Sequence, residues 1–235
     1  RLIEVNILNT FKTMQLAIDT GAKKYFSVST DKAASPINFM GASKRAMELV
    51  LGAYSNVIST SSVRFGNVAF SNGSLLKGII NRYENNQPFV APLDIKRYFL
   101  TPLEASKLSI LSAFLGQNGE VYIPILSKDV AENSFPNIIK NFLISKGLEM
   151  YVCKSEEEAR NKVASLYKSK KWPCYLFSSD TTGEKLEEIF ISRNEIIKKN
   201  KYKEIEIINI SNIKSQNDIL DFIQNLPIVV DRNSY

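Results

Sequence analysis

The stretch KYFSVST at residues 24–30 predicts a short buried strand that ends in hydroxyl side chains. Apolar residues at helical spacing predict a helix over residues 5–20, and Gly21 is a typical stop signal. A second helix is predicted over residues 42–54, and residues 59–65, rich in small and β-branched side chains, predict the next strand. This order of helix, strand, helix and strand is typical of a parallel α/β fold.

The alternation of helices and strands continues to the end of the chain. Further helices are predicted at residues 73–85, 102–115, 136–146, 156–170, 184–199 and 216–224. Further strands are predicted at residues 88–91, 120–125, 150–153, 175–178 and 204–210. A polar stretch at residues 127–134 separates two halves, so we expect one domain at residues 1–126 and a smaller α/β region at residues 127–235.

The segment at residues 192–203 is rich in lysine and glutamate. We interpret it as the solvated face of a helix, because Glu195 and Lys199 stand at the supportive i,i+4 spacing.

The composition excludes several common kinds of catalysis. The chain has 235 residues, 44% of them hydrophobic, which is enough for a sizeable core. It contains no histidine, which excludes Ser-His-Asp and Cys-His hydrolases and histidine-ligated metals, so we expect no metal site. Cys153 and Cys174 are too few for a disulfide scaffold, and we expect them to be buried apolar fillers. Catalysis must therefore use Asp, Glu, Lys, Tyr, Ser or Thr.

The net charge of +6 suits an anionic partner. Phosphorylated small molecules fit this charge as well as nucleic acid does, but no platform of aromatic and basic residues accompanies it, so we expect no nucleic acid. No stretch reaches the roughly 18 to 20 apolar residues of a membrane helix, and we expect a cytoplasmic protein. The chain opens on Arg1 instead of methionine, from which we expect that it is a piece of something longer.

Hydroxyl, carboxylate and ammonium groups follow the first predicted strand directly. Ligands of an open parallel sheet bind beyond the carboxyl ends of its strands, which is where Thr30, Asp31 and Lys32 stand. Lys44 follows twelve residues after Lys32, near the start of the next predicted helix. These groups could handle protons, whereas the simpler alternative is a capped turn with an ion pair.

The residues from Ser29 to Arg45 resemble the active-site stretch of the extended short-chain dehydrogenase/reductases, specifically the CapD-like nucleotide-sugar 4,6-dehydratases. The resemblance covers residues 1–125, and its other motifs are NILNT at 6–10, SVRFGNV at 62–68, DIKRYFLT at 94–101 and GEVYIP at 119–124. It implies a Rossmann-like parallel sheet that binds NAD, with residues 1–126 as the C-terminal part of that domain and its active site.

Two departures from the general dehydrogenase pattern matter. Where the superfamily has Tyr-x-x-x-Lys, this chain has Met40 four residues before Lys44, and methionine cannot act as a base. A subgroup of the resembled dehydratases shares this methionine. The ten glycines do not form the Gly-rich phosphate-binding turn of a Rossmann fold, so we expect the first strands to be absent and NAD binding by this chain alone to be poor.

The resemblance implies a redox-neutral dehydration. Such enzymes oxidise C4 of a hexose with NAD, which acidifies C5, eliminate the C6 hydroxyl as water and return the hydride to C6. The resemblance assigns C4-hydroxyl activation to Thr30 with help from Lys44, protonation of the departing oxygen to Asp31, and removal of the C5 proton to Lys32. The last two roles require shifted pKa values: the pKa of the Asp31 carboxyl must be raised, and the pKa of the Lys32 ammonium must be lowered.

The resemblance also implies binding residues. It assigns cofactor contacts to Asn9, Ser29, Met40 and Lys44, with Asn6 flanking the same edge, and substrate contacts to Asn67 and Arg97. Arg97 suits a diphosphate, although a salt bridge to Asp94 or Glu104 is the alternative. Arg64 and Lys77 are further candidates.

Other readings remain open. The leading substrate is UDP-N-acetylglucosamine, with the GDP-linked analogue second, and we expect a homo-oligomer. The alternatives are a nucleotide-sugar epimerase on the same fold, which needs no elimination pair, and a non-catalytic binding module, which Met40 would favour.

Residues 172–185 predict a strand that runs into a helix capped by Asp180 or Thr182, with Glu184 near its positive end.

Overall fold

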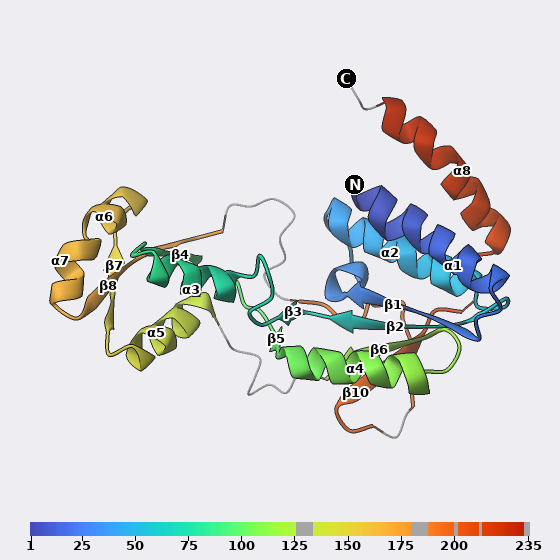
Figure 1. Cartoon of the computed structure of the whole chain (residues 1–235), viewed down its shortest axis with the longest axis horizontal. Coiled ribbons are helices and arrows are strands. Elements are labelled where there is room, and N and C mark those ends of the chain that lie inside the picture. Colours follow the sequence, from blue (N-terminus) through green and yellow to red (C-terminus); the bar gives the residue numbers. More distant parts are fainter. Residues whose placement is uncertain (126–133, 180–187, 200–201, 212, 233–235) are drawn as a thin grey trace. The chain divides into compact units, whose positions relative to one another are not determined.

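The computed structural model describes residues 1–125, 134–179, 188–199, 202–211 and 213–232 (Figure 1). The helices are α1 (Asn9–Asp19), α2 (Phe39–Ala53), α3 (Leu75–Glu84), α4 (Pro102–Leu115), α5 (Phe135–Ser145), α6 (Glu156–Asn161), α7 (Val163–Lys168) and α8 (Gln216–Arg232). The strands are β1 (Lys24–Thr30), β2 (Ser59–Phe65), β3 (Asn67–Val68), β4 (Phe89–Pro92), β5 (Phe99–Leu100), β6 (Glu120–Pro124), β7 (Glu149–Cys153), β8 (Lys171–Phe177), β9 (Ile197–Lys198) and β10 (Ile205–Asn209). A π-helical turn (Glu4–Leu8) leads into α1, and a 3-10 turn (Asp31–Ala33) follows β1.

The chain forms two compact units, each built from separate stretches of sequence. Unit 1 comprises Arg1–Phe65, Leu103–Ile125 and Ile189–Tyr235, and unit 2 comprises Gly66–Pro102 and Leu126–Glu188. The boundary expected between residues 126 and 127 falls at residues 126–133, which lie outside the described residues. Each unit takes segments from both sides of that point.

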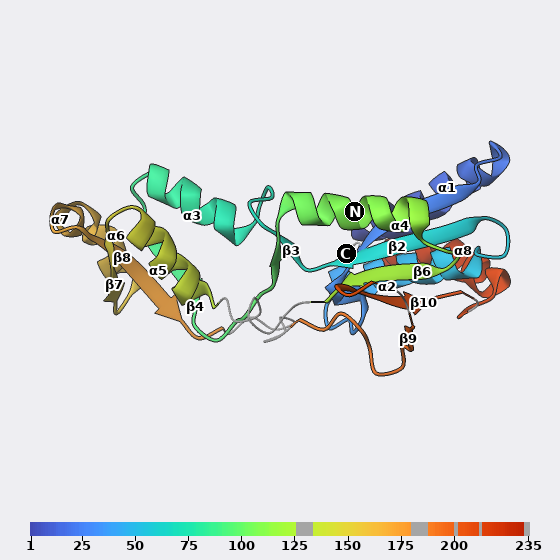
Figure 2. The same cartoon turned by 90° about the horizontal axis from the view of Figure 1, so that it is seen from below.

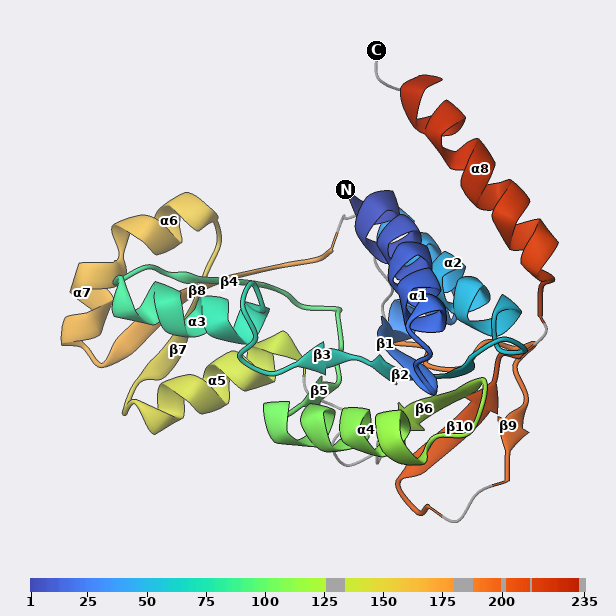
Figure 3. The same cartoon turned by 45° about the vertical axis from the view of Figure 1, so that its right-hand side comes forward.

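Unit 1 is a five-stranded sheet in the order β1-β2-β6-β10-β9. The predicted parallel arrangement holds for β1, β2 and β6, whereas β10 and β9 add antiparallel pairs at one edge (Figure 2). Helices α1 and α2 cover one face and α4 covers the other (Figures 1 and 3). Alternate residues of β6 serve the two faces: Val121 packs with Met47 of α2, and Tyr122 packs with Leu108 of α4.

Helix α2 approaches the sheet closely where it passes β10. An ideal Cβ on Gly52 would lie 2.1 Å from the carbonyl oxygen of Ile210, so no larger residue fits without moving the helix. A glycine is therefore required here by space.

We expect Gly52→Ala to lower the free energy of unfolding by about 2 kcal/mol, because the added methyl group must push α2 away from the sheet. Gly78→Ala is the matched control: Gly78 lies within α3 with nothing within 4 Å of the added Cβ, and alanine there should stabilise by up to about 1 kcal/mol. Urea unfolding followed by circular dichroism measures both. Equal stability of the two variants would show that α2 can shift at no cost.

Unit 2 contains a three-stranded parallel sheet in the order β4-β8-β7, and β3 pairs with β5 as a second small ladder. Its core gathers aromatic side chains around Trp172, which lies 4.9 Å from Tyr83 and 5.8 Å from Phe89 between ring centroids. Cys153 and Cys174 are buried free thiols, as predicted. Burial raises the pKa of the Cys174 thiol to about 12, which keeps it unreactive.

One predicted helix is wrong where it can be assessed. The structure has no helix in residues 188–199 of the helix predicted at 184–199; instead β9 pairs with β10. The side chain of Glu195 is only 7% exposed, so the interpretation of a solvated helix face is also wrong. The i,i+4 spacing of Glu195 and Lys199 suggested a helix, but Glu195 pairs with Arg64 of β2, which is distant in sequence. The cap predicted at residues 180–184 lies outside the described residues.

The remaining predicted elements are confirmed, with shifts of a few residues at most ends. The strand predicted at residues 24–30 is present as β1, but the expectation that it is buried is wrong: Val28 is exposed and only Ser29 is buried, because β1 lies at one edge of the described sheet. The helix predicted at 156–170 is split into α6 and α7, and α8 runs well beyond residue 224. None of the described helices combines the length and apolar character needed to cross a bilayer.

Candidate active site

The triplet Thr30, Asp31 and Lys32 lies where β1 ends and turns into the 3-10 turn. The Thr30 hydroxyl donates to Asp31 Oδ1 at 2.7 Å, and Lys32 Nζ lies 3.4 Å from the same oxygen. The Asp31 side chain is 3% exposed and that of Lys32 is 33% exposed. The carboxylate is thus withdrawn from solvent while the ammonium reaches the surface, which differs from an exposed ion pair.

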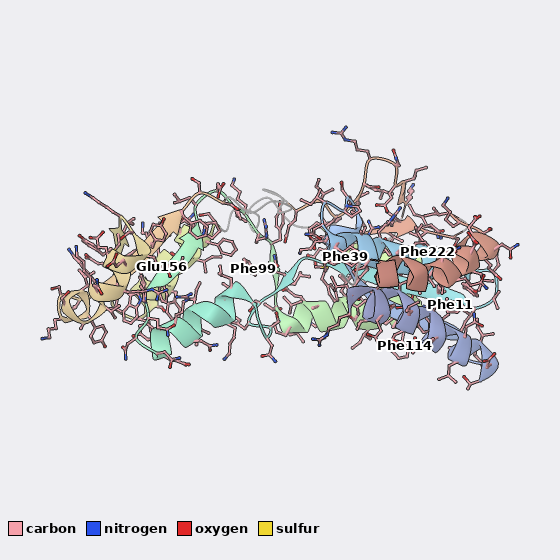
Figure 4. The ribbon with its side chains drawn as sticks, turned by 90° about the horizontal axis from the view of Figure 1, so that it is seen from above. Phe11, Phe39, Phe99, Phe114, Glu156 and Phe222 are labelled. Carbon is pink, nitrogen blue, oxygen red and sulfur yellow. The ribbon has the colours of Figure 1, made fainter. Side chains whose placement is uncertain are left out.

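Helix α2 begins against this turn. Asn38 caps it by accepting a hydrogen bond from the Gly41 amide at 2.9 Å. A Cβ on Gly41 would lie 2.6 Å from the carbonyl oxygen of Lys32, so glycine lets the first turn of α2 touch the backbone of the triplet. Phe39, the first residue of α2, is 60% exposed (Figure 4).

Lys44 is brought to the same strand end by α2. Its ammonium donates to the carbonyl oxygen of Val28 at 3.1 Å and lies 3.7 Å from the sulfur of Met47. Burial lowers the pKa of Lys44 from its ordinary value, and the nearby Glu48 carboxylate partly opposes that shift. The structure therefore places the predicted catalytic residues together in unit 1, around the carboxyl end of β1.

The predicted cofactor contacts have different surroundings. Met40 is half-buried on the first turn of α2, four residues before Lys44 and so on the same helix face. Asn9 is exposed, whereas Asn6 is buried and donates to the Ser43 hydroxyl at 2.9 Å, which ties the π-helical turn to α2. Ser29 is buried and donates to Glu48 at 2.7 Å.

A buried network of charges joins Arg64 of β2 to Glu48 of α2 and to Glu195, and it was not predicted from the sequence. Arg64, suggested above as a substrate contact, is fully buried between Glu48 and Glu195, with its Nη2 at 2.7 Å from each carboxylate. Its role in this structure is therefore structural. Arg45 joins the same two glutamates at 3.1 and 2.7 Å. The sequence signal that could have indicated this network is an arginine within a buried strand made mostly of small residues, since a buried arginine needs carboxylate partners.

Unit 2 contains a cavity of about 330 Å³ that both predicted substrate contacts line. Asn67 and Arg97 share it with Phe99, Phe135 and Phe177. The N-terminus of α3 adds Gly73, Ser74 and Leu75 to its wall, whereas Lys77 is not among the lining residues. A cavity with aromatic walls, a guanidinium and a helix start suits a ligand with a flat ring and an anionic group.

Glu188 lies beside these predicted substrate contacts and was not predicted from the sequence. Its carboxylate accepts from Asn67 Nδ2 at 2.6 Å and from the Tyr98 amide at 3.0 Å, and it lies 3.9 Å from Arg97 Nε. Asp94, one predicted partner of Arg97, instead accepts from the Ser179 amide at 3.0 Å. The carboxylate of Glu188 thus occupies donors that an anionic ligand would use.

The fold and this site together define an α/β protein with a Rossmann-like sheet whose polar site lies at a parallel strand end. The solved structure of Pen from Bacillus thuringiensis superposes with a TM-score of 0.68 at 25% identity, over 89% of this chain and 59% of that one. Residues 1–210 match the family described as polysaccharide biosynthesis protein, and the chain belongs to this family.

Two relatives refine the comparison. The capsular polysaccharide biosynthesis protein CapD of Staphylococcus aureus is 33% identical over 230 residues, which is 95% of this chain and 35% of CapD. The inverting UDP-N-acetylglucosamine 4,6-dehydratase of Campylobacter jejuni is 30% identical over 149 residues, which is 58% of this chain and 44% of that enzyme. Other relatives are named UDP-glucose 4-epimerase. The chain thus spans less than half the length of these two relatives.

Proposed function

We propose that the full-length protein is an NAD-dependent 4,6-dehydratase of a nucleotide-linked N-acetylhexosamine, with UDP-N-acetylglucosamine as the leading substrate and the GDP-linked sugar second. Its product would be a 4-keto-6-deoxy sugar for surface glycans. The observation that carries the proposal is the buried Asp31 carboxylate between a hydroxyl and an ammonium, at a strand end that Lys44 also reaches. The similarity to a 4,6-dehydratase supports it.

The residues around Lys44 fit part of a dinucleotide. The half-buried ammonium of Lys44 suits ribose hydroxyls, and Met40 on the same helix face suits an apolar ring. The chain offers no Gly-rich turn for the pyrophosphate, so we assign only the ribose and nicotinamide end to it. NAD, when bound, supplies reversible hydride transfer.

Each residue of the triplet has a distinct proton to handle. Thr30 donates its own hydroxyl proton to Asp31 in a hydrogen bond, so its oxygen can accept a hydrogen bond from the sugar C4 hydroxyl and orient it, while Lys44, in its neutral form, takes the C4 hydroxyl proton. Lys32, in its neutral form, takes the proton from C5, and Asp31, in its acid form, gives a proton to the C6 oxygen that leaves as water.

The cavity of unit 2 supports a nucleoside diphosphate as the part of the substrate that binds there. Arg97 and Asn67 are donors at its wall, and its aromatic residues offer a face for a base. Glu188 competes with an anion for these donors, so binding of a diphosphate requires that Glu188 exchange its contacts with Asn67 and Arg97.

An epimerase is the second candidate, because some relatives carry that name. A C4 epimerase needs the oxidation but no acid and base for elimination, so the Asp31 and Lys32 pair favours dehydration. A binding module without catalysis is the third.

The test is incubation of the full-length protein with UDP- and GDP-N-acetylglucosamine in deuterated water, followed by mass spectrometry and NMR. We expect a product that has lost one water and gained deuterium at C5, because C5 loses its proton to the enzyme. An unchanged mass with inversion at C4 would identify an epimerase instead. Absence of turnover with both donors would favour the binding module.

A further inference from the structure

The charged network beneath the strand ends has a fixed geometry. Arg64 donates through Nε and Nη2 to both oxygens of Glu48, at 2.8 and 2.7 Å, so the pair is bidentate. On its other edge Arg64 donates to both oxygens of Glu195 and to the carbonyl oxygen of Phe190. The side chains of Arg64 and Glu48 are both 0% exposed. Arg64 and Glu48 therefore make their hydrogen bonds inside the protein, which restricts this pair to one arrangement.

Ser29 connects this network to the candidate catalytic strand end. Its hydroxyl donates to Glu48 Oε1 at 2.7 Å, and Ser29 directly precedes Thr30. Ser29 also pairs with Arg64 in the register of β1 and β2. Glu48 Oε1 thus accepts from the side chains of two residues that face each other on adjacent strands.

Helix α2 contacts the end of β1 through two side chains one turn apart. Lys44 donates to the carbonyl oxygen of Val28, and Glu48 accepts from the next residue, Ser29. Lys44 and Glu48 stand at i,i+4, so they lie on one face of α2. The lysine of the candidate site and the anchor of its strand therefore move as one body.

We propose that Glu48 is a positioning residue: held by Arg64, it fixes Ser29 and so sets where Thr30, Asp31 and Lys32 stand relative to Lys44. The proposal rests on the proposed function of that triplet. It also gives Ser29 a role other than the cofactor contact that the resemblance implies, because the proton of its hydroxyl is directed to Glu48. Catalysis depends on placement to within fractions of an ångström, so a loosened strand end should cost rate more than binding.

Ser29→Ala is the direct test, because it removes the link and leaves the Glu48 and Arg64 pair intact. Ser62→Ala is the matched control: Ser62 is a buried serine of the neighbouring strand, and its hydroxyl donates to the carbonyl oxygen of Ser27 at 2.8 Å without touching Glu48. Both variants lose one buried hydroxyl from the same sheet. A general loss of stability should therefore be similar in the two.

In the full-length protein with UDP-N-acetylglucosamine, we expect Ser29→Ala to lower kcat at least about tenfold with KM changed less than twofold. Ser62→Ala should keep kcat within about twofold. Equal kcat values for the two variants would overturn the positioning role.

A second measurement does not depend on turnover. Hydrogen exchange of the backbone amides at residues 31–34 should be about tenfold faster in Ser29→Ala than in wild type, and unchanged in Ser62→Ala. Equal protection in Ser29→Ala and wild type would overturn the positioning role. If the wild-type protein turns over no donor, the proposed function fails, and the exchange measurement still decides whether Glu48 fixes this strand end.

Discussion

Asp31→Asn in the full-length protein should lower kcat by about a hundredfold to ten-thousandfold, the usual contribution of a general acid or base. Asparagine keeps the size of the side chain and can still accept the hydrogen bond from Thr30, but it has no proton to give to the departing C6 oxygen. Lys32→Ala should cause a loss of similar size, because nothing then removes the C5 proton. Steady-state kinetics with UDP-N-acetylglucosamine measures both.

Two exposed residues of unit 1 provide matched controls. Asp19→Asn and Lys107→Ala make the same chemical changes on the surface of α1 and α4, and both should keep kcat within about twofold. Circular dichroism should give wild-type melting curves for Asp31→Asn and Lys32→Ala. Near-normal rates in both site variants would remove Asp31 and Lys32 from the mechanism and leave only a scaffold that binds nucleotide sugars.

The Asp31 and Lys32 variants also separate dehydration from epimerisation. If either variant, incubated in deuterated water, accumulates a C4-oxidised sugar without losing water, the oxidation survives and the elimination is blocked. That outcome is expected here, since Thr30 and Lys44 are left in place.

Local sequence patterns were sufficient to predict the central fold. The strand predicted at residues 24–30 and the helix predicted at residues 42–54 became β1 and α2, because the local side-chain patterns agree with the final fold, and the Asn38 cap that starts α2 three residues earlier was not predicted. The position of the triplet Thr30, Asp31 and Lys32 was also predicted, since polar residues that directly follow a strand lie at the end of that strand wherever it stands in the sheet. The burial of Asp31 could not be predicted, because it depends on Gly41 allowing α2 to approach the turn.

Two of the missed residues, Glu188 and Glu195, share one cause. Glu188 and Glu195 are buried by partners far away in sequence, such as Asn67 for Glu188, 121 positions apart, and Arg64 for Glu195, 131 positions apart. A glutamate in a polar stretch is exposed in most proteins, so local pattern assigns it to the surface. Only the three-dimensional arrangement shows that an arginine of β2 meets it. The same reason explains why the predicted helix is wrong over residues 188–199, the part of it that the structure describes.

Arg64→Met should lower the free energy of unfolding of unit 1 by about 3 to 5 kcal/mol. The substitution fills most of the space but leaves the buried carboxylates of Glu48 and Glu195 without their main partner. Arg193→Met is the matched control, an exposed arginine in the segment that carries Glu195, and should change stability by less than about 0.5 kcal/mol. Urea unfolding, with hydrogen exchange of β2 amides to report on unit 1, measures the difference. A loss below 1 kcal/mol would mean that the network contributes little.

Glu195→Gln tests the same network through pH if Arg64→Met does not fold. Burial alone would raise the pKa of Glu195, but its hydrogen bonds with Arg64 and the charge of that arginine outweigh burial and hold the pKa at about 2. A carboxyl whose pKa is lower in the folded state stabilises the protein above its unfolded pKa of about 4.3, and this contribution is lost as the pH falls toward 2. The difference between the folded and unfolded pKa values corresponds to about 3 kcal/mol of stability. Solvent screens this contribution little, because the side chain of Glu195 is only 7% exposed. Wild type should therefore lose stability between about pH 5 and pH 2 more steeply than Glu195→Gln, and parallel pH profiles would show that Arg64 does not hold this carboxylate ionised.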